Sequence, residues 1–136
     1  MSSMDEVELL VQRAKNFLDA AKDRLLKGDY DLACFLAEQA VQLYLKAALL
    51  HHTGEISRSH SIRTLISILF DSTKDKKLLE LSKKNRLTLR LLEHAYIASR
   101  YLFDRFDKDD AEEAVKVAEK VFNVVQKLFE NINETG

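Results

Sequence analysis

The chain has 136 residues, 46% of them hydrophobic and 32% charged, and its formal net charge is −1. This length suits one domain with its own core, and the composition is that of a folded chain rather than a disordered one. The acidic N-terminus lacks the basic region of a secretion signal, and no apolar run reaches the roughly 20 residues that cross a bilayer. The single cysteine, Cys34, cannot form an internal disulfide. We therefore expect a cytoplasmic protein.

The first two elements are predicted to be long helices joined by a tight turn. Apolar residues recur at helical spacing from about Met4 to Lys27, and Ser3 and Glu6 have the spacing of a capping box. Gly28 is placed to end this helix in the left-handed conformation, and Asp29 to cap the next one. So short a break requires the two helices to form an antiparallel hairpin.

The second helix, which ends at Gly54, is apolar almost all the way round. Such a helix must be surrounded by other helices, and Cys34 within it is expected to be a buried thiol. Its few polar residues include a thin stripe of Glu38, Gln42 and Lys46, spaced four apart. If the helix is enclosed, these groups need partners, because each unpaired buried group costs about 1–3 kcal/mol. Solvent, the fourth helix, another subunit and a ligand all remain open as partners.

The remainder of the chain is predicted to form three more helices. A short one runs from about Ser61 to Phe70, and residues 71–77 form a loop or a frayed turn. A fourth helix ends at Phe103 and begins at about Leu78 or at about Asn85. If it begins at Asn85, residues Leu78–Lys83 form a separate turn before it. The last runs from about Asp110 to Ile132, after a cap at Asp107 or Asp109. With no proline and no strand pattern, we predict an all-α fold: a single domain over residues 1–136, an antiparallel up-and-down bundle of four long helices plus one short helix.

Charge is distributed unevenly along the chain. Seven basic and two acidic residues lie between Lys74 and Arg90, whereas seven acidic and three basic residues lie between Asp104 and Glu119. The first segment suggests an anionic partner, and the alternative is two ordinary solvated surfaces.

Several kinds of chemistry are not supported by the sequence. The chain has no glycine-rich phosphate loop, and Cys34 has no histidine nearby in sequence. His51 and His52 are adjacent and point about 100 degrees apart on a helix, so we expect no metal site and interpret them as cationic groups at a helix C-terminus. Two interpretations are open for His60. Its ring packs against the link or caps the short helix, or it contacts a ligand together with Arg58 or Arg63.

The fourth helix has the arrangement with the most chemical potential. Arg86, Arg90 and His94 are spaced by four and lie along one face. An imidazole exchanges protons near neutral pH, and guanidinium groups stabilise phosphate charge, which is chemistry that cleaves RNA without a metal. The alternatives are a solvated face and a face used in self-association.

The residues also carry a family resemblance. The second helix from Ala37 to Leu50, then Gly54, His60–Ile62 with Leu65, and Ser99–Arg100–Tyr101 resemble the HEPN domain (higher eukaryotes and prokaryotes nucleotide-binding). The resemblance implies a helical bundle that commonly dimerises and associates with a small nucleotidyltransferase, often as a toxin and antitoxin. Many members are metal-independent ribonucleases that use an arginine, four to six residues, then a histidine and x-Tyr, in a site shared by two subunits.

This chain departs from that ribonuclease pattern. His94–Ala95–Tyr96 fits its second half, but only three residues separate Arg90 from His94. The resemblance then favours the branch that binds nucleotides or acts as a partner module. We predict a dimeric binding module without a cofactor or membrane contact, whose partners are itself, a small nucleotidyltransferase, a nucleotide or RNA, and whose ligand residues are Arg86, Arg90, Arg100 and Lys46. The alternatives are a ribonuclease using His94, Arg90 and Tyr96, and a purely structural oligomeric bundle.

Overall fold

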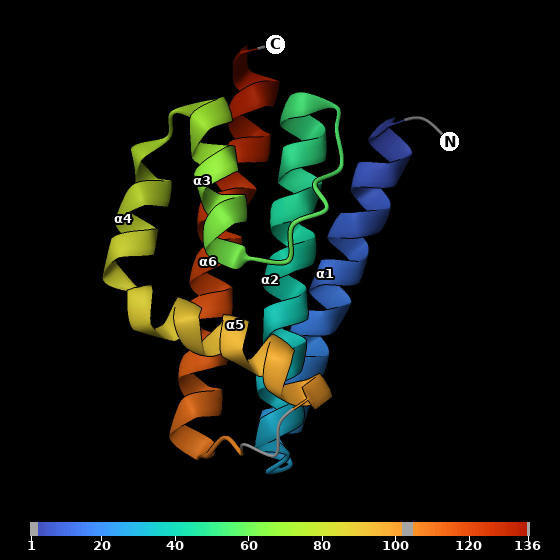
Figure 1. The fold of residues 1–136 in the computed structure, drawn as a ribbon. Coiled ribbons are helices and arrows are strands. Elements are labelled where there is room, and N and C mark those ends of the chain that lie inside the picture. The colour runs from blue at the N-terminus through green and yellow to red at the C-terminus, as the bar shows by residue number, and fades with distance from the viewer. Residues whose placement is uncertain (1–2, 102–104, 136) are drawn as a thin grey trace.

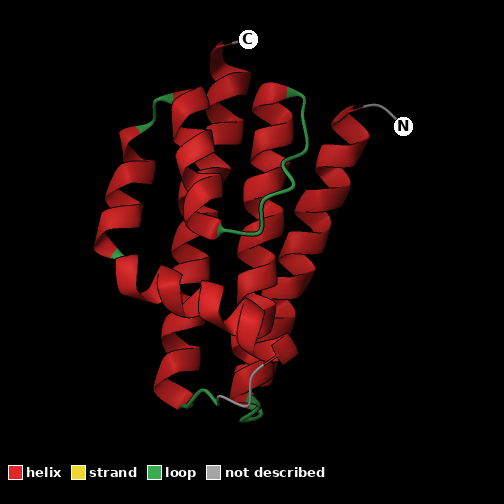
Figure 2. Cartoon of the chain, viewed as in Figure 1, coloured by secondary structure: helices red, strands yellow, loops and turns green. Residues whose placement is uncertain are grey.

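A computed structural model describes residues 3–101 and 105–135. Over these residues the chain forms six α-helices and no strand, which confirms the all-α prediction. The helices are α1 (Ser3–Leu26), α2 (Tyr30–Thr53), α3 (Ile62–Thr73), α4 (Lys76–Lys84), α5 (Arg86–Tyr101) and α6 (Lys108–Thr135). In Figure 1, α1, α2, α3 and α6 run up and down the bundle, and α5 crosses in front of its lower half. The longest loop in Figure 2 is the link from α2 to α3.

The turn between α1 and α2 forms as the sequence predicts, except for its cap. Gly28 has a φ of 79°, and the N–H of Asp29 donates to the carbonyl of Arg24 at 2.9 Å, which closes α1 in the glycine-dependent manner expected. Asp29 occupies the N-cap position of α2, but its side chain makes no capping hydrogen bond. The predicted capping box depends on the side chain of Ser3, which is not among the described side chains.

Helix α2 is the centre of the bundle. It packs against α1, α3, α5 and α6, and its fully buried side chains include Val41, Leu45 and Leu49. By length and composition α2 could span a membrane, with a mean hydropathy of 1.2 over 18 residues, whereas the sequence analysis expected no such segment. However, 67% of that window is buried among the other helices, as in the core helix of a bundle.

The buried thiol predicted for Cys34 is confirmed. Its side chain is fully buried in α2. Burial, together with the negative charges of Asp110, Asp31 and Asp107, raises the pKa of the thiol to about 12. The thiolate is the nucleophilic form, so Cys34 is an inert core residue.

The segment before α5 is more helical than the sequence suggests, and it forms a separate helix. Helix α3 continues to Thr73, and Lys74 ends it with a φ of 58°. Asp75 then caps α4 by accepting the N–H of Lys77 at 2.9 Å. The chain breaks again at Asn85, the C-cap of α4, whose side-chain amide and backbone N–H both donate to the carbonyl of Leu81, at 2.9 and 3.1 Å. Of the two starting points considered for the long helix, the structure therefore has the later one.

Helix α6 begins two residues earlier than predicted. The N–H of Asp110 donates to the Asp107 carboxylate at 2.8 Å, and the N–H of Asp107 donates to the Asp110 carboxylate at 3.0 Å. This reciprocal pair is a capping box in which aspartate replaces the usual glutamate. Asp107, rather than Asp109, is therefore the cap.

Candidate functional site

The face of α5 predicted to carry chemistry is largely open to solvent. Arg86 and Arg90 are exposed, and His94 is half-buried. The His94 ring lies edge-on to Phe106, with 5.9 Å between ring centroids. The N–H of Phe106 in turn donates to the Asp31 carboxylate at 2.6 Å. His94 therefore faces the segment that leads into α6, close to the start of α2.

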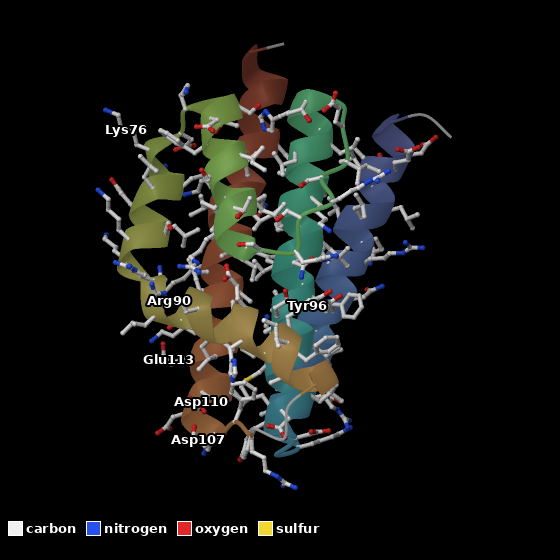
Figure 3. The ribbon with its side chains drawn as sticks, in the orientation of Figure 1. Lys76, Arg90, Tyr96, Asp107, Asp110 and Glu113 are labelled. Atoms are coloured by element: carbon white, nitrogen blue, oxygen red, sulfur yellow. The ribbon has the colours of Figure 1, made fainter. Side chains whose placement is uncertain are left out.

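Tyr96 faces a different part of the molecule. Two residues on a helix are separated by about 200 degrees, so Tyr96 lies across α5 from His94. Its ring stacks on that of His60, with centroids 5.3 Å apart and an interplanar angle of 17°. Figure 3 shows Arg90 near the start of α5 and Tyr96 farther along it, towards α2. Within one chain, the structure does not bring His94 and Tyr96 to a common site.

The predicted ligand residues are also distributed over several elements. Lys46 is half-buried on α2, where desolvation lowers the pKa of its ammonium and the charge of Glu38 partly opposes that shift. Arg86 starts α5 directly after Asn85, whose side chain lies 3.4 Å from Lys120 of α6. The side chain of Arg100, and the Ser99–Tyr101 motif, lie outside the described side chains.

Two residues of the polar stripe of α2, Glu38 and Gln42, have partners inside the same chain. Glu38 is fully buried, and Gln42 is 4% exposed. The Glu38 carboxylate accepts hydrogen bonds from the amide of Gln39 at 2.7 Å and from the amide of Gln42. The amide oxygen of Gln42 lies 3.2 Å from Nδ1 of His60, in the link between α2 and α3. The Glu38 carboxylate is therefore paired with two glutamines of its own helix, and one of these, Gln42, contacts His60 in the link.

Glu93 joins α5 to the start of α3. This contact was not predicted from the sequence. The Glu93 carboxylate accepts hydrogen bonds from the Arg63 guanidinium at 3.2 and 3.1 Å, from the Arg63 N–H at 3.0 Å and from the Ser61 hydroxyl at 3.2 Å. Burial raises the pKa of Glu93, but the hydrogen bonds and the charge of Arg63 outweigh it, so the pKa is lowered overall. Periodicity places Glu93 on a face, and no local signal identifies a partner thirty residues away.

The two adjacent histidines are half-buried at the end of α2. The Nε2 atoms of His51 and His52 are both buried without a hydrogen-bond partner, and the His51 ring packs on Phe129 at 5.0 Å. Burial, followed by the charge of His51, lowers the pKa of His52. Desolvation therefore favours the neutral form of His52, which works against the cationic role inferred from its place in the last turn of α2. Among the described residues, no cluster of side chains is suited to hold a metal ion.

The fold and this site define an all-α bundle with an open basic helix face, and comparison with known proteins gives its family. The sequence pattern of the HEPN domain matches residues 7–128. The chain therefore belongs to the HEPN domain family. A search of curated proteins found no match.

Two solved structures share the fold over nearly the whole chain. The crystal structure of TT1696 from Thermus thermophilus is 27% identical, with a TM-score of 0.76 over 90% of this chain and 97% of that one. ST0689, described as an archaeal HEPN homologue, is 26% identical, with a TM-score of 0.67 over 89% of this chain and 95% of that one.

Proposed function

We propose that this chain is a dimeric HEPN binding module that takes a nucleotide or a small nucleotidyltransferase as its partner, as one half of a toxin–antitoxin-like pair. The observation that carries the proposal is a surface of exposed cations on α4 and the first half of α5, called here the basic surface. Its residues are Lys76, Lys77, Lys83, Lys84, Arg86 and Arg90.

The basic surface is available to a partner. Within the described part of the chain, none of its six side chains forms an ion pair, although Glu80 is exposed on the same helix. Lys76 and Arg90 lie at opposite ends of this surface in Figure 3, while Asp107, the cap of α6, and Asp110 and Glu113 in its first turns lie below the surface. Separate patches of opposite sign raise the rate of encounter with charged partners and orient them.

Binding, rather than RNA cleavage, is favoured by the arrangement of the predicted catalytic residues. Arg90 is exposed one turn before His94, but Tyr96 is engaged with His60 on the other side of α5. The HEPN ribonuclease pattern, with four to six residues between arginine and histidine, is also not met. Arg86 and Arg90 are therefore assigned to partner binding.

Charge reversal on the basic surface tests this function. The double variant Arg86→Glu, Arg90→Glu is expected to weaken binding of ATP, GTP or a small nucleotidyltransferase about tenfold or more, since each lost charge-assisted hydrogen bond is worth about 1.5–3 kcal/mol. Titration calorimetry measures the change. Arg13→Glu, Lys15→Glu on the exposed side of α1 is the matched control, because it alters net charge equally. Equal losses in both variants, or no binding by the wild type, would contradict the proposal.

Self-association is supported by apolar side chains on the same helix. Leu87 is 78% exposed and Ile97 is 48% exposed, and both lie on α5 near Arg90 and His94. Apolar surface of this kind is commonly covered by a second subunit. Sedimentation equilibrium is expected to give twice the 15.6 kDa of the chain, and Leu87→Glu is expected to shift the equilibrium towards the monomer. A wild type that stays monomeric at high concentration would exclude the dimer.

A further inference from the structure

The contacts of His60 fix which of its ring nitrogens carries a proton. A carboxylate only accepts hydrogen bonds, so the side of the Gln42 amide that faces Glu38 must be the NH₂ group. The amide oxygen of Gln42 therefore faces Nδ1 of His60, at 3.2 Å. Because that oxygen cannot donate, Nδ1 must carry the hydrogen. In the neutral imidazole, Nε2 is then the acceptor.

The imidazole is also fixed in orientation and open to solvent. One face of the ring lies against Tyr96, while the residue as a whole is exposed. Among the described residues, none forms a hydrogen bond with Nε2 of His60. The ring thus presents an aromatic surface and an acceptor nitrogen with a defined direction.

Packing of the link against the bundle does not by itself explain the hydrogen bonds that run from Glu38 through Gln42 to His60. These hydrogen bonds begin at the Glu38 carboxylate, which is fully buried. Burial of a charged group is costly unless the group is well hydrogen-bonded. Apolar side chains would hold the link without that cost. A buried group that orients an exposed imidazole through an intermediate amide is the kind of support that holds a functional side chain in place.

We propose that His60 and Tyr96 form a site for a nucleobase, separate from the basic surface, in which the base stacks on the imidazole and donates an N–H to Nε2. Nucleobases are planar and carry N–H donors on their edges, and proteins commonly stack unpaired bases on histidine and tyrosine. Gln42 and Glu38 act as positioning residues. Lys46, one turn beyond Gln42 on the same stripe, and Arg58, exposed in the link, provide positive charge on this side.

The tautomer is the first test of the proposal. In ¹⁵N-detected spectra of the full chain, the neutral ring of His60 is expected to carry its hydrogen on Nδ1 and none on Nε2. Gln42→Met removes the acceptor and is expected to release the ring to a mixture of tautomers. A wild-type His60 that carries its hydrogen on Nε2 would overturn the proposal.

Ligand titration is the second test and uses adenosine and uridine, which lack phosphate. Both are expected to shift the ring signals of His60 and Tyr96, and His60→Ala is expected to weaken binding about tenfold or more, the effect of losing one stacking contact. His60→Phe keeps an aromatic ring, so its affinity for the nucleosides is expected to lie between that of the wild type and that of His60→Ala. Arg13→Ala, on the exposed side of α1, is the control and should bind as the wild type does.

The outcomes separate this site from the basic surface. No shift at His60 with either nucleoside, or equal affinity in His60→Ala and wild type, would overturn the nucleobase site and leave the proposed function standing. Shifts that inorganic phosphate alone reproduces would also overturn it. Loss of nucleotidyltransferase or ATP binding in the Arg86 and Arg90 variant, with nucleoside binding unchanged, would support two separate sites. Circular dichroism establishes that each variant is folded.

Discussion

Replacing Leu45 with alanine is expected to lower the free energy of unfolding by about 2–5 kcal/mol. Leu45 is fully buried at the middle of α2, the helix that packs against four of the other five. The change removes buried apolar surface and leaves a cavity that the surrounding helices cannot fill without moving. Urea unfolding followed by circular dichroism measures the loss.

Leu26→Ala is the matched control for that variant. Leu26 ends α1 and is 88% exposed, so the same substitution there removes little buried surface. Its expected effect is within about 0.5 kcal/mol of the wild type. Comparable destabilisation by both variants would show that α2 is not the centre of the core.

Glu93→Gln is the second change with a large expected effect. At neutral pH we expect a loss of about 2 kcal/mol, because the carboxylate accepts hydrogen bonds from Arg63 and Ser61 at the junction of α3 and α5. The figure is below that of a fully buried pair, since the Arg63 side chain is 41% exposed. Glu8→Gln, on the exposed side of α1, is the control and should have almost no effect.

The same variant predicts a change in pH dependence. The folded-state pKa of Glu93 lies below its ordinary value of 4.5. The ionised group therefore adds stability that is fully present above 4.5 and is lost as the pH falls through the lowered folded-state pKa. Glutamine cannot ionise, so the gap between wild type and Glu93→Gln should narrow below pH 4.5. A gap that stays constant into acid would show that the charge of Glu93 does not stabilise the fold.

The secondary structure could be predicted well because the signals for it are local. Helical periodicity predicted the long helices α1, α2 and α6, and Gly28 and Gly54 both adopt the positive φ expected where helices end. Where the sequence left two positions open, a side chain decided between them. The side-chain amide of Asn85 bonds back to the last turn of α4, and the cap of α6 falls on Asp107 because Asp110 is spaced to return its hydrogen bond. The loop predicted over residues 71–77 and the side-chain cap predicted at Asp29 were wrong.

The candidate site could be predicted only in part. Spacing placed Arg90 and His94 on one face of α5, and both lie at least partly open to solvent. Spacing could not show that Tyr96 stacks on His60, or that Glu93 pairs with Arg63 rather than with the arginines of its own helix. These partners are thirty or more residues apart in sequence, and their meeting depends on how α3 and α5 are rotated and crossed.

The sequence by itself determined that this chain is a helical bundle, that α2 is its centre and that the chain has the pattern of a HEPN domain. Those properties follow from which residues are apolar and how they are spaced, since burial of apolar surface drives the fold and helix geometry sets the period. Only the tertiary structure decided what the polar groups contact. A hydrogen bond requires its two atoms to lie about 3 Å apart, and periodicity along one helix does not specify the packing that brings Glu38, Gln42 and His60 together.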